Sequence, residues 1–204
     1  QLSEVESLLE LCRRHILLYD DLSQCFALDY HTKLTPSGSQ RTEVGQLVYL
    51  AKPYRRNPTL RNFEASSSLA ERMVQFVRNH PTYRRSEVIV SAPPSRPEGQ
   101  FDLPTQLAGH LLKSFHNLTD GRKWVQKVRQ TRAMKDCRTI PEKIANVKDA
   151  FEITTDDDIR DRTVLVIDDI YESGFTLNEL ARVLFAGGAK TVLGLVASKT
   201  GRDM

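Results

Sequence analysis

The stretch Val164-Leu-Val-Ile-Asp-Asp-Ile-Tyr-Glu-Ser-Gly-Phe-Thr-Leu177 decides the fold of this 204-residue chain. Its first four residues are apolar, which predicts a buried strand. Asp168 and Asp169 follow at once, then the short polar turn 172–174, and Thr176 opens an amphipathic helix. A strand, a loop and a helix N-terminus in this order predict an anion site built from loop N–H groups and the helix dipole. The two carboxylates can accept hydrogen bonds from a polyol or hold a hydrated magnesium ion.

Length and composition indicate an ordinary globular protein. Hydrophobic residues make up 40% of the chain and charged residues 27%, which suits a fold with a real core. This length predicts one domain, or one domain with a small lobe, and we divide it into a helical N-terminal lobe (1–42) and a main domain (43–204). The net charge of +3 is too weak to argue for nucleic acid by itself, but it is consistent with phosphate-rich partners.

The cysteines and the lengths of the apolar runs indicate in which cellular compartment we expect the protein. Cys12, Cys25 and Cys137 are far apart and odd in number, so they match neither a disulfide framework nor a zinc spacing. We therefore expect a reducing, cytoplasmic environment. No apolar run approaches the length of a membrane span, and nothing resembles a signal peptide. The chain starts at Gln1 rather than Met, which is consistent with a trimmed or excised domain.

The first 80 residues are predicted to be mainly helical. Apolar residues recur at helical spacing over residues 3–28, whereas residues 29–42 are polar and are predicted to form a loop. Residues 44–51 fit either a helix or a strand. A capping-box pattern at Ser68 predicts the start of a helix that runs to about Asn79.

The rest of the chain alternates strands with helices. This order predicts an α/β fold with a mainly parallel sheet that is covered by helices on both faces. Right-handed crossovers would bring the ends of the strands 87–91 and 163–168 to the same edge of the sheet. The other predicted strands lie at 124–128, near 153 and at 191–197, and the predicted helices begin at Asp102, Thr139 and Thr176.

Two further loops are candidates for ligand contacts. The proline-containing residues 92–95 directly follow the strand 87–91, which is the layout of a ligand loop at the carboxyl edge of a parallel sheet. A rigid connector would have the same composition. Residues 129–138 are basic with little apolar periodicity, so they fit either a mobile loop that closes over an anionic substrate or an ordinary exposed loop.

The segment Val164–Leu177 resembles the phosphoribosyl-pyrophosphate signature of the type I phosphoribosyltransferases. That signature is a run of apolar residues, two acidic residues, two apolar residues, two small hydroxyl residues, glycine, any residue, and threonine or serine. Residues 186–192, Ala-Gly-Gly-Ala-Lys-Thr-Val, are similar to the usual continuation of the family. Over residues 44–200 the chain most resembles the branch named after the competence protein ComF. The matching positions are Lys52 and Tyr54, the segment Ser91–Leu111 and the segment Arg129–Phe151.

The resemblance implies a type I phosphoribosyltransferase fold and a transferase that binds phosphoribosyl pyrophosphate with Mg²⁺ and passes phosphoribose to an unknown nucleophile. Magnesium and basic residues would stabilise the leaving pyrophosphate, and a closing loop would exclude water. The implied catalytic residues are Asp168 and Asp169, which bind the ribose hydroxyls and are the candidate direct Mg²⁺ ligands, and Arg129, Arg132 and Lys135 of the basic loop. The implied 5-phosphate loop is Glu172, Ser173, Gly174, Phe175 and Thr176, and the implied pyrophosphate loop is Ala92, Pro93, Pro94 and Ser95.

The chain also departs from the family pattern. Glu172 replaces a small hydroxyl residue, and its carboxylate would repel a phosphate unless the side chain points outward. Pro53 interrupts the lysine–tyrosine pair, residues 97–102 replace the usual Arg-Gly-Phe-Asn, and the N-terminal zinc-binding cysteine module is absent. These departures support an alternative, a catalytically weak or inactive sensor of nucleotide or phosphoribosyl pyrophosphate, with a DNA-handling partner in DNA uptake, DNA processing or defence. A plain structural domain is the third hypothesis, and we expect a homo-oligomer.

Overall fold

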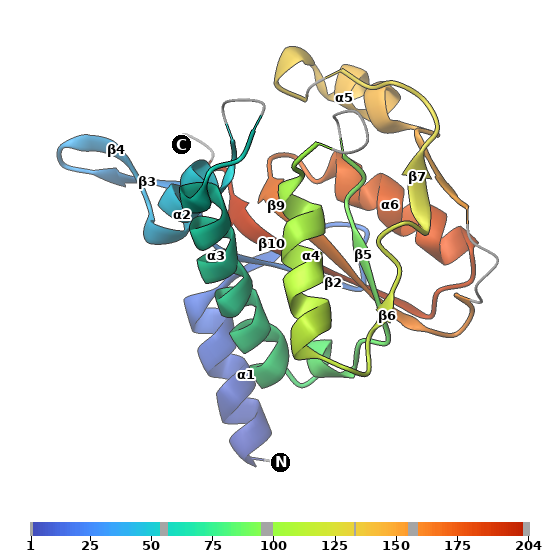
Figure 1. Ribbon diagram of the computed structural model, residues 1–204, viewed down its shortest axis with the longest axis horizontal. Coiled ribbons are helices and arrows are strands. Elements are labelled where there is room, and N and C mark those ends of the chain that lie inside the picture. Colours follow the sequence, from blue (N-terminus) through green and yellow to red (C-terminus); the bar gives the residue numbers. More distant parts are fainter. Residues whose placement is uncertain (1, 54–56, 95–99, 133, 155–158, 202–204) are drawn as a thin grey trace.

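The computed structural model describes residues 2–53, 57–94, 100–132, 134–154 and 159–201 (Figure 1). Its centre is a six-stranded sheet with the strand order β1-β2-β10-β9-β5-β6. β1 pairs antiparallel with β2, and the other neighbours in this sheet are parallel. The strands are β1 (Ile16–Leu18), β2 (Gln24–Tyr30), β5 (Val88–Ser91), β6 (Thr119–Asp120), β9 (Thr163–Tyr171) and β10 (Thr191–Lys199).

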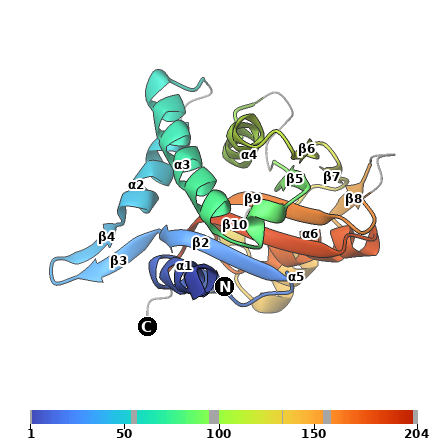
Figure 2. The ribbon, with the colours of Figure 1, turned by 90° about the horizontal axis from the view of Figure 1, so that it is seen from below.

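Helices cover both faces of this sheet. On one face, α2 (Glu43–Ala51), α3 (Leu60–Asn79) and α4 (Leu103–Ser114) pack on a cluster that includes Leu165 and Ile167. On the other face, α6 (Phe175–Ala186) packs on Val164 and Val166. The side chains of β9 point alternately to the two faces, because successive side chains of a strand point in opposite directions. Figure 2 shows α3 and α4 above β9 and β10. The predicted α/β class with a mainly parallel, doubly covered sheet is confirmed.

Smaller elements surround this core. α1 (Leu2–Arg14) leads into β1, and η1 (Tyr83–Arg85) leads into β5. β7 (Val125–Lys127) and β8 (Phe151–Ile153) form a separate antiparallel pair over α6. Between them lie η2 (Met134–Asp136) and α5 (Ile140–Val147). No helix in the described part of the chain combines the length and the apolar composition needed to cross a membrane.

The predicted helix over residues 3–28 is wrong beyond Arg14. β2 lies inside the main sheet instead, and Cys25, Phe26 and Ala27 are fully buried there. Its parallel pairing with β10 gives the backbone a partner that the sequence pattern does not reveal. The N-terminal segment is therefore helical only in α1 and supplies two strands to the sheet. The domain division at residue 42 stays a prediction.

The predicted loop over residues 29–42 is also wrong. It forms a hairpin of β3 (Thr32–Thr35) and β4 (Gly38–Arg41), which projects from the body of the molecule (Figures 1 and 2). The ambiguous segment 44–51 is the helix α2. The Thr42 side chain caps α2 by accepting a hydrogen bond from the Gly45 N–H.

The helix predicted from Ser68 begins eight residues earlier, at Leu60. Thr59 is its N-cap, and the Ser68 hydroxyl bonds the Glu64 carbonyl one turn back within the helix. The predicted end at Asn79 is confirmed. Buried side chains along this helix include Leu69, Met73, Phe76 and Val77. A serine inside a helix can satisfy its hydroxyl in this way, so a capping-box pattern alone does not fix a helix start.

The strands predicted at 87–91, 163–168 and 191–197 are confirmed as β5, β9 and β10. β9 and β10 run beyond their predicted ends, so the acidic pair lies within β9 rather than after it. The strand predicted at 124–128 is β7, outside the main sheet.

Candidate functional site

The carboxyl edge of the sheet, at the top of Figure 1, brings together two of the predicted loops. Ser91 at the end of β5 pairs in register with Ile167 of β9, and the Ala92 N–H donates to the Ile167 carbonyl at 2.9 Å. The loop that begins at Ala92 is thereby tied beside Asp168. Ala92, Pro93 and Pro94 lie there as predicted. Ser95 and Tyr54 lie outside the described residues.

Two cavities flank the acidic pair. One, of about 250 Å³, lies between Asp168, the loop 92–94 and the start of α4. The other, of about 280 Å³, lies between Asp168 and the residues 172–177 at the start of α6. Lys52, Asp168 and Thr176 line both cavities, so the two form one cleft with Asp168 at its middle. We call them the α4 cavity and the α6 cavity.

The two aspartates have different surroundings. The Asp169 carboxylate is paired with the Lys52 ammonium, which lies 2.8 Å from its Oδ2. Asp168 Oδ1 accepts a hydrogen bond from the Asp169 N–H at 2.8 Å. Burial, followed by the nearby Asp169 carboxylate, raises the pKa of Asp168 to about 8. At neutral pH Asp168 is therefore mainly protonated and Asp169 is neutralised by Lys52.

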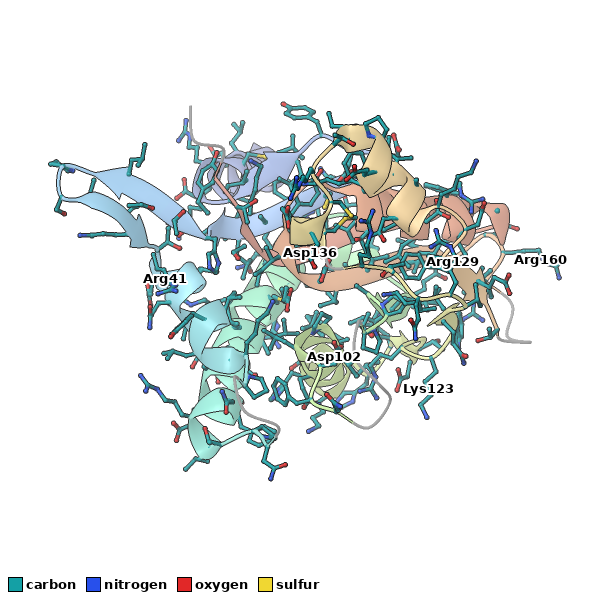
Figure 3. The ribbon with its side chains drawn as sticks, turned by 90° about the horizontal axis from the view of Figure 1, so that it is seen from above. Arg41, Asp102, Lys123, Arg129, Asp136 and Arg160 are labelled. Carbon is teal, nitrogen blue, oxygen red and sulfur yellow. The ribbon has the colours of Figure 1, made fainter. Side chains whose placement is uncertain are left out.

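A third carboxylate lines the α4 cavity. Asp102 caps α4 as predicted, because its Oδ2 accepts hydrogen bonds from the Thr105 N–H at 3.0 Å and the Thr105 hydroxyl at 2.7 Å. Burial raises the pKa of Asp102, although the bonds from Thr105 oppose the shift. Figure 3 looks down on this edge and shows Asp102 at the near end of α4. The α4 cavity is thus acidic, with Lys52 as the cation among its described lining residues.

The start of α6 has the features of an anion site. Its N-cap is Gly174, with φ of +77°, so no side chain occupies the position that Thr42, Asp102 and Thr139 occupy at α2, α4 and α5. The first N–H groups of a helix have no intrahelical acceptor. They face the α6 cavity together with the helix dipole, which favours an anion there.

Gly174→Ala is expected to weaken anion binding by about tenfold or more and to destabilise the protein by about 1–3 kcal/mol. The left-handed backbone disfavours a Cβ, and that Cβ would lie 2.3 Å from the Tyr171 hydroxyl oxygen. Ribose 5-phosphate titration and thermal unfolding would measure the two effects. Gly38→Ala is the matched control, because φ is +109° there but the added Cβ has open space. Equal anion affinity for Gly174→Ala and wild type would contradict this role.

Glu172 does not stand unpaired in the predicted phosphate loop. Its Oε1 lies 3.1 Å from the Nζ of Lys143, which belongs to α5. The carboxylate that would repel a phosphate is therefore held by a cation from outside the loop. Sequence reasoning did not single out Lys143, the one lysine within α5, because no motif marks it.

The basic loop packs on α5. The Arg129 guanidinium donates to the Ala145 carbonyl at 2.9 Å and also to the Lys148 carbonyl. The Asn146 side chain bonds both the N–H and the carbonyl of Arg132, at 2.8 and 3.0 Å. Arg129 and Arg132 line a separate cavity beside α5, and Arg129 lies to the right of Asp102 in Figure 3.

Arg129 and Arg132 are not among the lining residues of the cleft in this conformation, and their catalytic role stays a prediction. Lys135 belongs to η2, and its side chain lies outside the described residues. Met134 is the described residue of this loop that lines the α6 cavity.

The donor set suits a magnesium ion that arrives with its ligand. No group of three or more metal-binding side chains occurs among the described residues, so a complete protein cage is not present there. Asp168 and Asp169 offer carboxylate oxygens at the middle of the cleft. Mg²⁺ prefers such oxygens and usually keeps several waters beside one or two carboxylates and the phosphates of its ligand.

No family model and no curated protein matches the chain. Among solved structures, it is similar to the phosphoribosylpyrophosphate synthetase from Mycobacterium smegmatis, with 16% identity and a TM-score of 0.40 over 64% of this chain and 33% of that one. It is also similar to the L. donovani hypoxanthine-guanine phosphoribosyl transferase, with 15% identity and a TM-score of 0.39 over 66% of this chain and 69% of that one. A Staphylococcus aureus hypoxanthine phosphoribosyltransferase is similar too, with 13% identity and a TM-score of 0.41 over 69% of this chain and 69% of that one. Likeness at this level concerns the fold, so the function has to be argued from the cleft.

Proposed function

We propose that the chain binds phosphoribosyl pyrophosphate with Mg²⁺ in this cleft and transfers the phosphoribosyl group to a nucleophile, a base or a related acceptor. The observation that carries the proposal is the order of features along the cleft. Asp168 lies between an anion site at a helix N-terminus and a second cavity that Asp169 and the loop 92–94 also line. A ribose with a phosphate on one side and a pyrophosphate on the other has groups in that same order.

Each part of the cleft then has a role. The α6 N-terminus binds the 5-phosphate, and Asp169 accepts hydrogen bonds from the ribose hydroxyls once Lys52 moves to the anionic groups. Asp168 is protonated at neutral pH and can donate to a hydroxyl, or it can lose its proton when a cation approaches. The α4 cavity receives the pyrophosphate.

The excess of acidic residues in the α4 cavity indicates that a pyrophosphate would need a bound cation there. Asp102, Asp168 and Asp169 line this cavity with Lys52, so a bare pyrophosphate would meet three carboxyl groups. Mg²⁺ bound to the pyrophosphate would offset that repulsion and stabilise the leaving group. The carboxylates would also stabilise positive charge on the ribose carbon.

The reaction is a substitution at the ribose carbon. The bond from C1 to the pyrophosphate oxygen breaks and its electron pair leaves with the pyrophosphate, while the lone pair of the acceptor forms the new bond. Loss of the acceptor proton completes the step. The described residues supply binding, orientation and charge, which are the main contributions a protein makes to such a transfer.

We further propose that the chain belongs to the ComF-like branch, on the matching positions given above, and that it is cytoplasmic, on the number and spacing of its cysteines. The place of Lys52 in the cleft supports this assignment. A homo-oligomer remains part of the proposal.

A second candidate is a sensor that binds the same ligand with little or no turnover, beside a DNA-handling partner. The observation that favours it is the position of Arg129, whose guanidinium bonds carbonyls of α5 rather than lining the cleft. Pyrophosphate release with a panel of bases separates the two. Binding without release across the panel favours the sensor.

Asp169→Asn is expected to weaken the binding of phosphoribosyl pyrophosphate by roughly tenfold to a hundredfold, because a charge-assisted hydrogen bond is lost. The fold should persist, since Asp169 lines the cleft and its carboxylate is paired with Lys52 rather than packed among core side chains. Calorimetry with Mg²⁺ and the ligand measures the change. Asp120→Asn is the control, because it removes a carboxylate from β6, outside the cleft. No heat for wild type at millimolar ligand would overturn the proposed function.

A further inference from the structure

The negative charge of Glu172 would oppose the binding of a phosphate in the α6 cavity. Glu172 lines the same cavity as the N-terminus of α6. An unpaired carboxylate a few ångströms from a phosphate would weaken phosphate binding by more than about tenfold, because the cavity is partly shielded from water. The cation among the described residues lining this cavity is Lys52, and its ammonium is bonded to Asp169.

Lys143, which lies outside the phosphate loop, forms an ion pair with Glu172. Its Nζ lies 3.1 Å from Glu172 Oε1, across 29 residues of sequence. The Lys143 side chain is 20% exposed and that of Glu172 39%, so solvent screens this pair less than a pair on the open surface. The ammonium thus neutralises the one carboxylate in the segment 172–176.

The backbone that carries Lys143 is held in place. Thr139 caps α5 by accepting from the Glu142 N–H, and the Asn146 side chain ties α5 to the basic loop through both polar backbone groups of Arg132. Arg129 binds the carbonyls at the other end of α5. α5 also packs against α6. Lys143 therefore reaches Glu172 from a helix with fixed ends, which lowers the entropic cost of holding the pair.

We propose that Lys143 is the positioning residue of the phosphate loop, and that it acts by neutralising and orienting Glu172 rather than by binding the phosphate itself. This inference rests on the proposed function, because it concerns the loop that would hold the 5-phosphate. The ligand class is a phosphomonoester, and the pair Lys143–Glu172 sets its affinity.

A double-mutant cycle with ribose 5-phosphate as the probe tests this role. Lys143→Met is expected to weaken ribose 5-phosphate binding about tenfold, because Glu172 is left unpaired beside the phosphate. Glu172→Gln should bind more tightly than wild type by about two- to threefold, because it removes a negative charge beside the phosphate and leaves Lys143 as a free cation. The double variant should recover the affinity of wild type. Lys143→Arg keeps the charge and should restore most of the affinity. Lys148→Met is the matched control, since it removes the same charge from the end of the same helix without removing a partner of Glu172.

The outcomes separate this inference from the proposed function. A double variant as weak as Lys143→Met would mean that Lys143 binds the phosphate directly, and it would overturn the inference. Equal losses for Lys143→Met and Lys148→Met would overturn it too, because the effect would then be one of net charge. Wild type that binds ribose 5-phosphate with the expected cycle, but not phosphoribosyl pyrophosphate, would overturn the proposed function alone. Wild type that binds neither compound would overturn both. Thermal unfolding of each variant would show that a loss of binding is not a loss of fold.

Discussion

Gly45→Ala is expected to destabilise the protein by about 3 kcal/mol or more, because the new methyl group would overlap main-chain atoms. A Cβ at Gly45 would lie 1.9 Å from the carbonyl oxygen of His31 and 2.7 Å from its carbonyl carbon. His31 cannot move aside easily, since its N–H donates to the Lys199 carbonyl at 2.7 Å and ties it to β10. The helix α2 must shift instead.

A shift of α2 should also change the cleft, because α2 carries Lys52. Lys52 is the C-cap of α2 and places its ammonium on Asp169, so a displaced α2 removes the cation from the acidic pair. Denaturant unfolding would measure the loss of stability, and calorimetry with phosphoribosyl pyrophosphate the loss of affinity.

Gly109→Ala is the control, because Gly109 also lies inside a helix. The nearest atom to its added Cβ is the Nη1 of Arg122 at 2.9 Å, at the flexible end of a side chain. Since alanine favours a helix over glycine, the control should be neutral or stabilising by up to about 1 kcal/mol. Equal stability of Gly45→Ala and wild type would show that α2 does not pack on His31 as described.

Asp168→Asn is expected to stabilise the ligand-free protein at alkaline pH while it weakens binding. The folded pKa of Asp168 is about 8 and its ordinary value is 3.8, so between these values the folded state holds a proton that the unfolded state has lost. Stability therefore falls as the pH rises through this window, and the full loss is present above pH 8. Asparagine does not ionise, so the variant should be more stable than wild type at pH 9, by up to about 5 kcal/mol for a pKa raised by about four units, and nearly equal to it at pH 4.

Denaturant unfolding across this pH range would measure the difference. A stability gap that does not grow with pH would contradict the raised pKa. Ligand binding supplies a second readout, because a cation near Asp168 favours its ionised form. Binding of phosphoribosyl pyrophosphate with Mg²⁺ at pH 7 should release a proton in wild type and not in Asp168→Asn. Calorimetry in buffers of different ionisation enthalpy would count that proton.

Local sequence signals predicted the C-terminal half of the fold well. The apolar run before Asp168, the helix after Gly174 and the caps Asp102 and Thr139 each specify their element through nearby residues. The N-terminal segment was predicted poorly, because β2 is a strand through its pairing with β10 rather than through its own pattern. Apolar residues at helical spacing earlier in this segment suggested that the helix continues, since no local feature shows a partner more than 160 residues away.

In the candidate site too, local sequence patterns predicted some residues and missed those that tertiary packing brings in. Parallel strand order was enough to place the loop 92–94 beside Asp168, and both line the cleft. Lys52 was found only through a family resemblance, and Lys143 was missed. Tertiary packing brings Lys52 to Asp169 and Lys143 to Glu172, and no local sequence pattern shows either contact. The basic loop was recognised, but its composition did not show that Asn146 and Arg129 fasten it to α5.

The central place of β10 has a consequence for how this molecule is made. β10 is the last described strand of the chain, yet it lies between β2 and β9 and joins them into one sheet. During synthesis, β1 and β2 leave the ribosome long before the strand that connects them to the rest of the sheet. Contacts between residues so far apart close slowly and leave strand edges exposed until they form. The sheet that carries the acidic pair on β9 is therefore completed only after β10 has emerged.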